Sequence, residues 1–133
     1  MSTATDSALQ AKLVMPSLTV DDLQASLRFF EGLGFVVEER WEDKGTLNGV
    51  MLRAGNVQIG LTQDDWKKGR DRTKGVGSRL FIETTQNIDE LAARARRAGV
   101  TLNADPHDGE GRRMFEITEP SGFLLTIMSP EKK

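Results

Sequence analysis

The sequence of 133 residues has no cysteine, no tyrosine and a single histidine, His107. The absence of cysteine excludes disulfides, thiol catalysis and zinc sites built from thiolates, and it is compatible with a reducing compartment. A formal net charge of -2 provides no positive field that could hold nucleic acid or an anionic membrane. No apolar run reaches the ~20 residues that a membrane-spanning helix needs. We therefore expect a cytoplasmic protein that binds neither nucleic acid nor a membrane.

The first half of the chain shows one helix pattern among several strand patterns. Residues 13–20 alternate between the two faces of a half-buried strand, and Pro16 indicates an irregular start. Residues 21–34 repeat apolar side chains at helical spacing, with Asp21 or Asp22 as the N-terminal cap. Turn residues then separate three further predicted strands, over residues 35–41, 49–55 and 57–62.

The second half repeats this order at an offset of 65 residues. Its predicted helix covers residues 87–99 and has Asn87 as its cap. The turn-rich stretch "DPHDGEG", which contains His107, is predicted as a loop. The predicted strands cover residues 79–84, 100–104, 112–118 and 123–128.

A module of about 55 residues is too small to bury a sheet face and a helix by itself, so the two halves should pack together. We predict an α+β fold in which two tandem βαβββ modules form a curved mixed sheet around a central cavity, with the helices on the outside. Residues 1–10 lack the pattern of a signal peptide and are expected to be a disordered tail. The other expected boundaries within this single structural domain are a first module over 11–62, a linker over 63–77, a second module over 78–130 and a tail over 131–133.

The predicted linker, "QDDWKKGRDRTKGVG", carries five basic residues and three aspartates. The net excess of two positive charges is weak support for binding nucleic acid. Its glycines and polar groups are typical of a flexible, hydrated connection. Because it runs between two strands of the cavity wall, Trp66 and Arg70 or Arg72 are candidates for the rim of a ligand site. A linker without a ligand, or a dimer contact, is the alternative.

Three motifs resemble the vicinal oxygen chelate superfamily, which includes glyoxalase I, extradiol dioxygenases, fosfomycin-resistance proteins and bleomycin-resistance proteins. They are "LTVDDLQASLRFFEGLGF", "AARARRAGV" and "FEITEPSGFLLTI". The resemblance covers residues 13–129, and Glu119 stands where the family's closing turn usually carries aspartate. It implies the same duplicated fold, and a homodimer in which the sheets of two copies complete each other's cavities.

The resemblance also implies where a metal would bind. Metal-dependent members hold a divalent ion through four positions, chiefly His, Glu or Gln, and these positions correspond here to Met15, Gly60, Arg79 and Thr126. A soft thioether, a glycine and a cation cannot assemble a site for such an ion. We therefore expect no divalent metal and no other cofactor, as in the bleomycin-resistance branch, whose cavity binds a small-molecule ligand without transforming it. A slipped register would favour the alternative, a metal-dependent enzyme of the glyoxalase or dioxygenase type acting on a substrate with vicinal oxygens.

Strand alternation selects the side chains that should face the cavity. Arg79 is the candidate anchor, because a guanidinium in place of the metal could grip a carboxylate, phosphate or enolate with two hydrogen bonds. The alternative is a salt bridge from Arg79 to Glu83 or Glu116, or an interface contact. No catalytic residue is assigned. The full set of candidate ligand-binding residues is Met15, Ser17, Gln58, Trp66, Arg79, Phe81, Glu83, Glu116 and Thr126.

Overall fold

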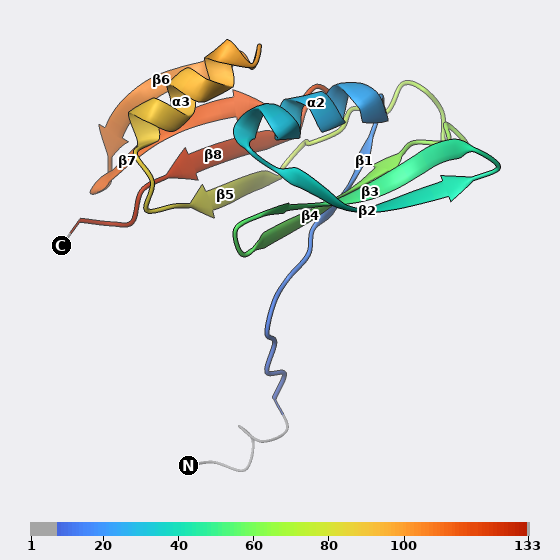
Figure 1. The fold of residues 1–133 in the computed structure, drawn as a ribbon, viewed down its shortest axis with the longest axis horizontal. Helices are drawn as coiled ribbons and strands as arrows, with labels where there is room; N and C mark the ends of the chain where they lie inside the picture. The colour runs from blue at the N-terminus through green and yellow to red at the C-terminus, as the bar shows by residue number, and fades with distance from the viewer. Residues whose placement is uncertain (1–7, 133) are drawn as a thin grey trace.

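The computed structural model describes residues 8–132, and most of the predicted tail over residues 1–10 therefore lies outside the described residues (Figure 1). The chain folds as two βαβββ modules in the predicted order. In the first module, β1 (Ser17–Val20) precedes α2 (Leu23–Leu33), which is followed by β2 (Val36–Asp43), β3 (Thr46–Ala54) and β4 (Val57–Gln63). None of the described helices has the length and apolar character needed to cross a membrane.

The second module has the same succession of elements. Here β5 (Arg79–Glu83) precedes α3 (Ile88–Arg97), which is followed by β6 (Leu102–Gly109), β7 (Arg112–Thr118) and β8 (Leu124–Met128). Hydrogen bonding divides the curved surface into two four-stranded sheets, with the orders β1-β4-β3-β2 and β5-β8-β7-β6. β1 runs parallel to β4, and β5 runs parallel to β8. The other neighbouring strands are antiparallel. The mixed α+β architecture inferred from the repeat is confirmed.

Both helices cover the same side of the two sheets and contact each other (Figure 1). The side chain of Asp22 caps α2 by accepting from the backbone N–H of Ala25, at 3.2 Å, and Asn87 caps α3 in the same way. Gly34 ends α2 with a left-handed φ of 109°, a conformation that glycine adopts without steric cost. The predicted helices and caps are therefore present, with Asp22 rather than Asp21 as the cap of α2.

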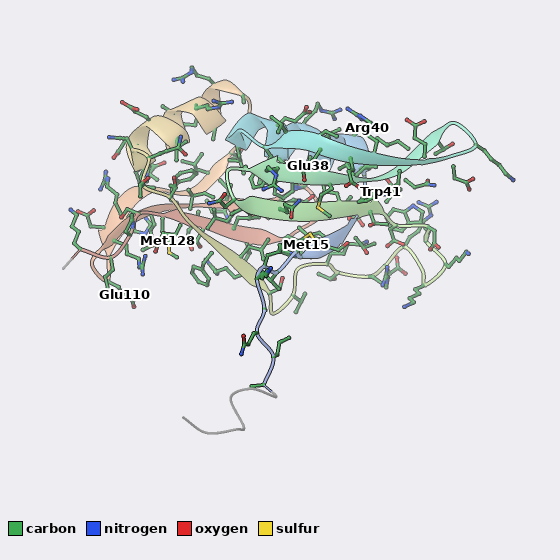
Figure 2. All side chains as sticks on the ribbon, turned by 60° about the horizontal axis from the view of Figure 1, so that its bottom comes forward. Met15, Glu38, Arg40, Trp41, Glu110 and Met128 are labelled. Atoms are coloured by element: carbon green, nitrogen blue, oxygen red, sulfur yellow. The ribbon has the colours of Figure 1, made fainter. Side chains whose placement is uncertain are left out.

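One hydrophobic core joins the two modules beneath the helices. Strand alternation sends Val20, Ile59 and Leu61 of the first sheet, with Phe115 and Leu125 of the second, into this core. The side chains between them point to the opposite side. We call this side of the two sheets, which faces away from α2 and α3 and comes forward in Figure 2, the open face.

The first strand and the predicted loop around His107 differ from expectation. β1 begins at Ser17 rather than at Leu13, because Pro16 precedes it and the chain before it runs away from the sheets (Figure 1). β6 extends through the predicted loop as far as Gly109, so that His107 lies on a strand and pairs with Met114. β6 is an edge strand with two register shifts, and the one between Ala104 and His107 spans Pro106. Alternation of apolar residues does not reveal such irregular pairing.

Two positions of the predicted linker pack against the modules. Gln63 belongs to β4, and the following Asp64 is buried. The backbone of Gly75 packs directly against the turn before β8, since a Cβ atom on Gly75 would lie 2.3 Å from the carbonyl oxygen of Gly122. Asp64 and Gly75 are therefore packed against the modules, while residues 67–73 between them are exposed. The flexibility of the linker stays a prediction.

Candidate functional site

A hollow of about 550 Å³ lies on the open face of the second sheet. Its floor and walls come from β5, β7 and β8, and the turn between β6 and β7 forms one side. Its volume falls in the range of pockets that hold small organic molecules. Met128 and Glu110 mark this end of the sheet in Figure 2. The lining residues are Phe81, Gly109, Glu110, Arg112, Met114, Thr126 and Met128.

Arg79 lies beside this hollow and is held by two neighbours. Its Nη1 atom donates to Oγ1 of the buried Thr126 at 3.1 Å and forms a short ion pair with Glu116. The three residues meet because β5 and β7 flank β8, where Glu116 is directly opposite Thr126. The salt bridge from Arg79 to Glu116, which the sequence left as an alternative to ligand binding, is thus present.

Arg112 is a second cation at the hollow, and it is not among the site residues predicted from the sequence. Its Nη1 atom donates to Oε1 of Glu83 at 2.7 Å and to the carbonyl oxygen of Ser129 at 2.9 Å. Glu83 therefore pairs with Arg112 rather than with Arg79. Period-two alternation along β7, backwards from Glu116 through Met114, could have identified Arg112.

The predicted site residues of the first module lie apart from this hollow. Ser17 pairs with Gly60 across β1 and β4, and neither lines the hollow. Gln58 donates to Oε1 of Glu38 at 2.6 Å, while Nε of Arg53 lies 2.5 Å from Oε2 of the same carboxylate. The hydrogen bonds from Arg53 and Gln58 hold the pKa of Glu38 below its ordinary value. This is a charged, exposed cluster on the open face of the first sheet, where Figure 2 labels Glu38.

Trp66 contacts cations of its own linker. The guanidinium carbon of Arg70 and the ammonium nitrogen of Lys74 each lie 4.8 Å from the centre of its ring. The ammonium nitrogen of Lys74 also lies 2.9 Å from Oδ2 of the buried Asp64. Nη2 of Arg72 makes a second ion pair with the same oxygen, at 2.7 Å. The Lys74 ammonium, then the backbone N–H of Trp66 and the Arg72 guanidinium, hold the pKa of Asp64 well below its usual range. Trp66 is not among the residues that line the hollow, and a ligand contact by Trp66 stays a prediction.

A larger hollow, of about 680 Å³, lies on the helix side between the modules. The C-terminal end of α2, the turn between β3 and β4, and the connection from β5 to α3 line it. Glu83 is the only one of the predicted site residues along its wall. Two predicted site residues, Phe81 and Thr126, line the hollow on the open face, compared with one in the larger hollow. The hollow on the open face is therefore the stronger candidate site.

The model of the glyoxalase/bleomycin resistance protein/dioxygenase superfamily matches residues 12–127. The chain belongs to this superfamily.

Solved structures agree in fold. A glyoxalase/bleomycin resistance protein/dioxygenase from Nocardioides has a TM-score of 0.73 and 16% identity, covering 98% of this chain and 90% of that one. TioX from Micromonospora sp. ML1 has a TM-score of 0.71 and 16% identity, covering 90% and 98%. A virulence protein from Salmonella typhimurium has a TM-score of 0.67 and 22% identity, covering 92% and 98%. No curated protein matches the sequence.

Membership in the superfamily raises the question of a metal, and the residues at the expected positions do not fit one. Gly60 has no side chain, and Arg79 places a cation beside Thr126 where a metal ion would need an electron-pair donor. Met15 offers only a soft thioether. Within residues 8–132, no three His, Cys, Asp or Glu side chains come together as a metal site would require. Glu116, an oxygen donor next to Arg79, is engaged by the guanidinium.

Proposed function

We propose that this superfamily member binds a small aromatic anion in the hollow on the open face of the second sheet, without a metal. The observation that carries the proposal is the placement of two arginines beside an exposed apolar surface. Arg112 lines the hollow with Phe81 and Met114, and Arg79 is bonded to Thr126 in its wall. Such binding corresponds to the bleomycin resistance proteins named in the family description, rather than to its enzymes.

The apolar part of the hollow suits a planar ring. Phe81 is 62% exposed although it lies on a regular strand, so one face of its ring is free for a ligand. Met114 and Met128 add flexible, polarisable side chains that make favourable contacts with aromatic rings. An aromatic ligand would remove all three from water at once, which favours binding through the hydrophobic effect.

The two arginines favour an anionic group on that ring. A guanidinium has five N–H donors. Arg79 uses Nη1 for Glu116 and Thr126. Arg112 uses Nη1 for Glu83 and the Ser129 carbonyl, and its Nη2 lies 4.0 Å from Oε2 of Glu131. Donors therefore remain for a carboxylate or phosphate of the ligand. Glu83 and Glu116 already balance the two cations, and Glu110 also lines the hollow. These carboxylates oppose added negative charge, so we expect moderate affinity and no more than one anionic group on the ligand.

A thermal-shift screen with matched aromatic carboxylates and their neutral amides tests this proposal. We expect the carboxylates to raise the melting temperature of the wild type more than the amides do. Phe81→Ala should reduce the shift for both series, and Arg112→Gln should remove the preference for the carboxylates. Arg97→Gln is the matched control, since Arg97 is exposed at the end of α3 on the other side of the sheets.

Two results would count against the proposal. Equal stabilisation of wild type and Arg112→Gln by every carboxylate would show that Arg112 does not hold the anion. A rise in melting temperature on addition of nickel, manganese, iron or zinc, reversed by a chelator, would contradict binding without a metal and favour an enzyme of the glyoxalase or dioxygenase type.

A further inference from the structure

The hollow of about 680 Å³ on the side covered by α2 and α3 lies where the two modules meet (Figure 1). We call it the helix-side hollow. The first module lines it with the C-terminal end of α2 and the turn between β3 and β4, and the second with β5, α3 and the connection between them. β5 separates this hollow from the one on the open face, since period-two alternation directs Ile82 to one side and Phe81 to the other. A ligand in one hollow therefore leaves the other accessible.

The apolar surface that the helix-side hollow offers to a ligand is aliphatic. Leu33, Val57, Ile82 and Leu91 pack against the core and yet are only partly buried where they line the hollow. The two phenylalanines of the lining are no more than 5% exposed, so little ring surface is free for stacking. Such walls favour a hydrocarbon chain over a flat ring, and removing chain and walls from water drives binding through the hydrophobic effect.

Arg94 brings one uncompensated charge to these apolar walls. Among the described residues, no carboxylate forms a salt bridge with Arg94. The other charged residue of the lining, Glu83, already pairs with Arg112, at 2.7 Å between Oε1 and Nη1. The charge left over at the hollow is therefore a single positive one, and a ligand with one negative charge matches it.

The guanidinium of Arg94 extends from α3 to the first module. Its Nη2 and Cζ atoms lie 3.8 and 3.9 Å from the position that a Cβ atom of Gly34 would occupy at the end of α2. The partial negative charge of a helix C-terminus attracts a cation, and this glycine has no side chain that would displace it. Within the part of the chain that the structure describes, the side chain of Arg94 donates no hydrogen bond. Its N–H groups therefore remain for a carboxylate, which a guanidinium binds with two parallel hydrogen bonds.

We propose that the helix-side hollow is a second ligand site, which binds an aliphatic monocarboxylate with its chain between the modules and its carboxylate on Arg94. The site goes beyond the proposed function and does not rest on it, because its anchor and its apolar walls differ from those of the hollow on the open face. A ligand held by both modules stabilises their packing, so binding also raises the melting temperature.

Nuclear magnetic resonance of the isotopically labelled full chain locates the site, with octanoate and its neutral amide, octanamide, as probes. We expect saturable shifts of the backbone amides of Gly34, Gly55 and Leu91, which line the helix-side hollow. The amides of Gly109 and Met114, which line the hollow on the open face, should not shift. An aromatic carboxylate that binds as described under the proposed function should give the opposite pattern.

Three variants separate the charge from the apolar walls. Arg94→Gln should weaken octanoate binding about tenfold, the effect of losing a hydrogen bond to a charged group, and leave octanamide binding unchanged. Arg97→Gln is the matched control, because Arg97 lies on α3 outside the lining, and it should bind both probes as the wild type does. Ala54→Leu adds volume to the wall of the hollow and should weaken both probes.

Three results would overturn the second site. They are the absence of saturable shifts with either probe, shifts confined to the open face, and equal affinity of wild type and Arg94→Gln for octanoate. Arg94 is exposed, so its replacement should leave the melting temperature without ligand unchanged and the comparison valid. The response to aromatic carboxylates is read from different amides, so the proposed function and the second site can fail independently.

Discussion

The contact between Ser26 and Glu119 makes a quantitative prediction about how the two modules are held together. Ser26 lies on α2 of the first module and Glu119 in the turn between β7 and β8 of the second; both are buried, at 0% and 1% exposure. The hydroxyl of Ser26 donates to Oε2 of Glu119, whose Oε1 accepts the backbone N–H of Ser121 at 2.6 Å. This bond therefore joins the modules through their shared core.

The expected cost of Ser26→Ala follows from leaving one oxygen of a buried carboxyl group without its donor. Such a loss lowers the free energy of unfolding by about 1–3 kcal/mol. Alanine is a better helix former than serine by up to ~0.5 kcal/mol, so the measured loss underestimates the bond. For a domain of this size we expect the melting temperature to fall by roughly 3–5 °C per kcal/mol. Glu119→Ala should cost more, because it leaves both Ser26 and the N–H of Ser121 without an acceptor and creates a cavity.

Urea unfolding followed by circular dichroism measures these differences, and the double variant measures the coupling between the two residues. If the bond acts as described, the combined loss should be smaller than the sum of the single losses by about 1 kcal/mol or more. Ser78→Ala is the control for the same chemical change at an exposed position. A loss below about 0.5 kcal/mol for Ser26→Ala, together with additive single effects, would refute the reasoning, since surface substitutions alone stay within that range.

Two further predictions concern the linker. Asp64 has a lowered pKa in the folded protein, so its stabilising effect is fully present above its ordinary value of 3.8 and is lost as the pH falls through the lowered value. The difference in melting temperature between wild type and Asp64→Asn should therefore be largest near neutral pH and narrow below about pH 4; a constant difference would contradict this. Gly75→Ala should destabilise the fold by about 2 kcal/mol or more, because a left-handed φ of 80° and the clash with Gly122 add together. Gly69→Ala, with a φ of 97° but no atom within 4 Å of its Cβ, should cost only about 1 kcal/mol in the same unfolding assay.

The candidate site was predicted only in part, because sequence alternation gives the face of a residue but not its partners. Alternation placed Phe81 and Thr126 on the same side of the second sheet, and both line the hollow. It could not decide whether Arg79 pairs with Glu83 or Glu116, since that depends on the order of strands. With β8 between β5 and β7, Glu116 faces Arg79 across Thr126, and Glu83 lies within reach of Arg112.

The sequence by itself determined the duplicated modules, their helices and the separation of a buried face from an open one. Apolar spacing and capping residues are local properties, and Asp22, Asn87 and Gly34 mark helix ends without reference to distant parts of the chain. Only the tertiary structure decided which charges meet and which segments are packed. The linker's composition favours flexibility, yet the side chains of Asp64 and Lys74 are buried there and form an ion pair with each other. Contacts between residues far apart in sequence depend on the arrangement of whole strands, and local patterns do not contain that information.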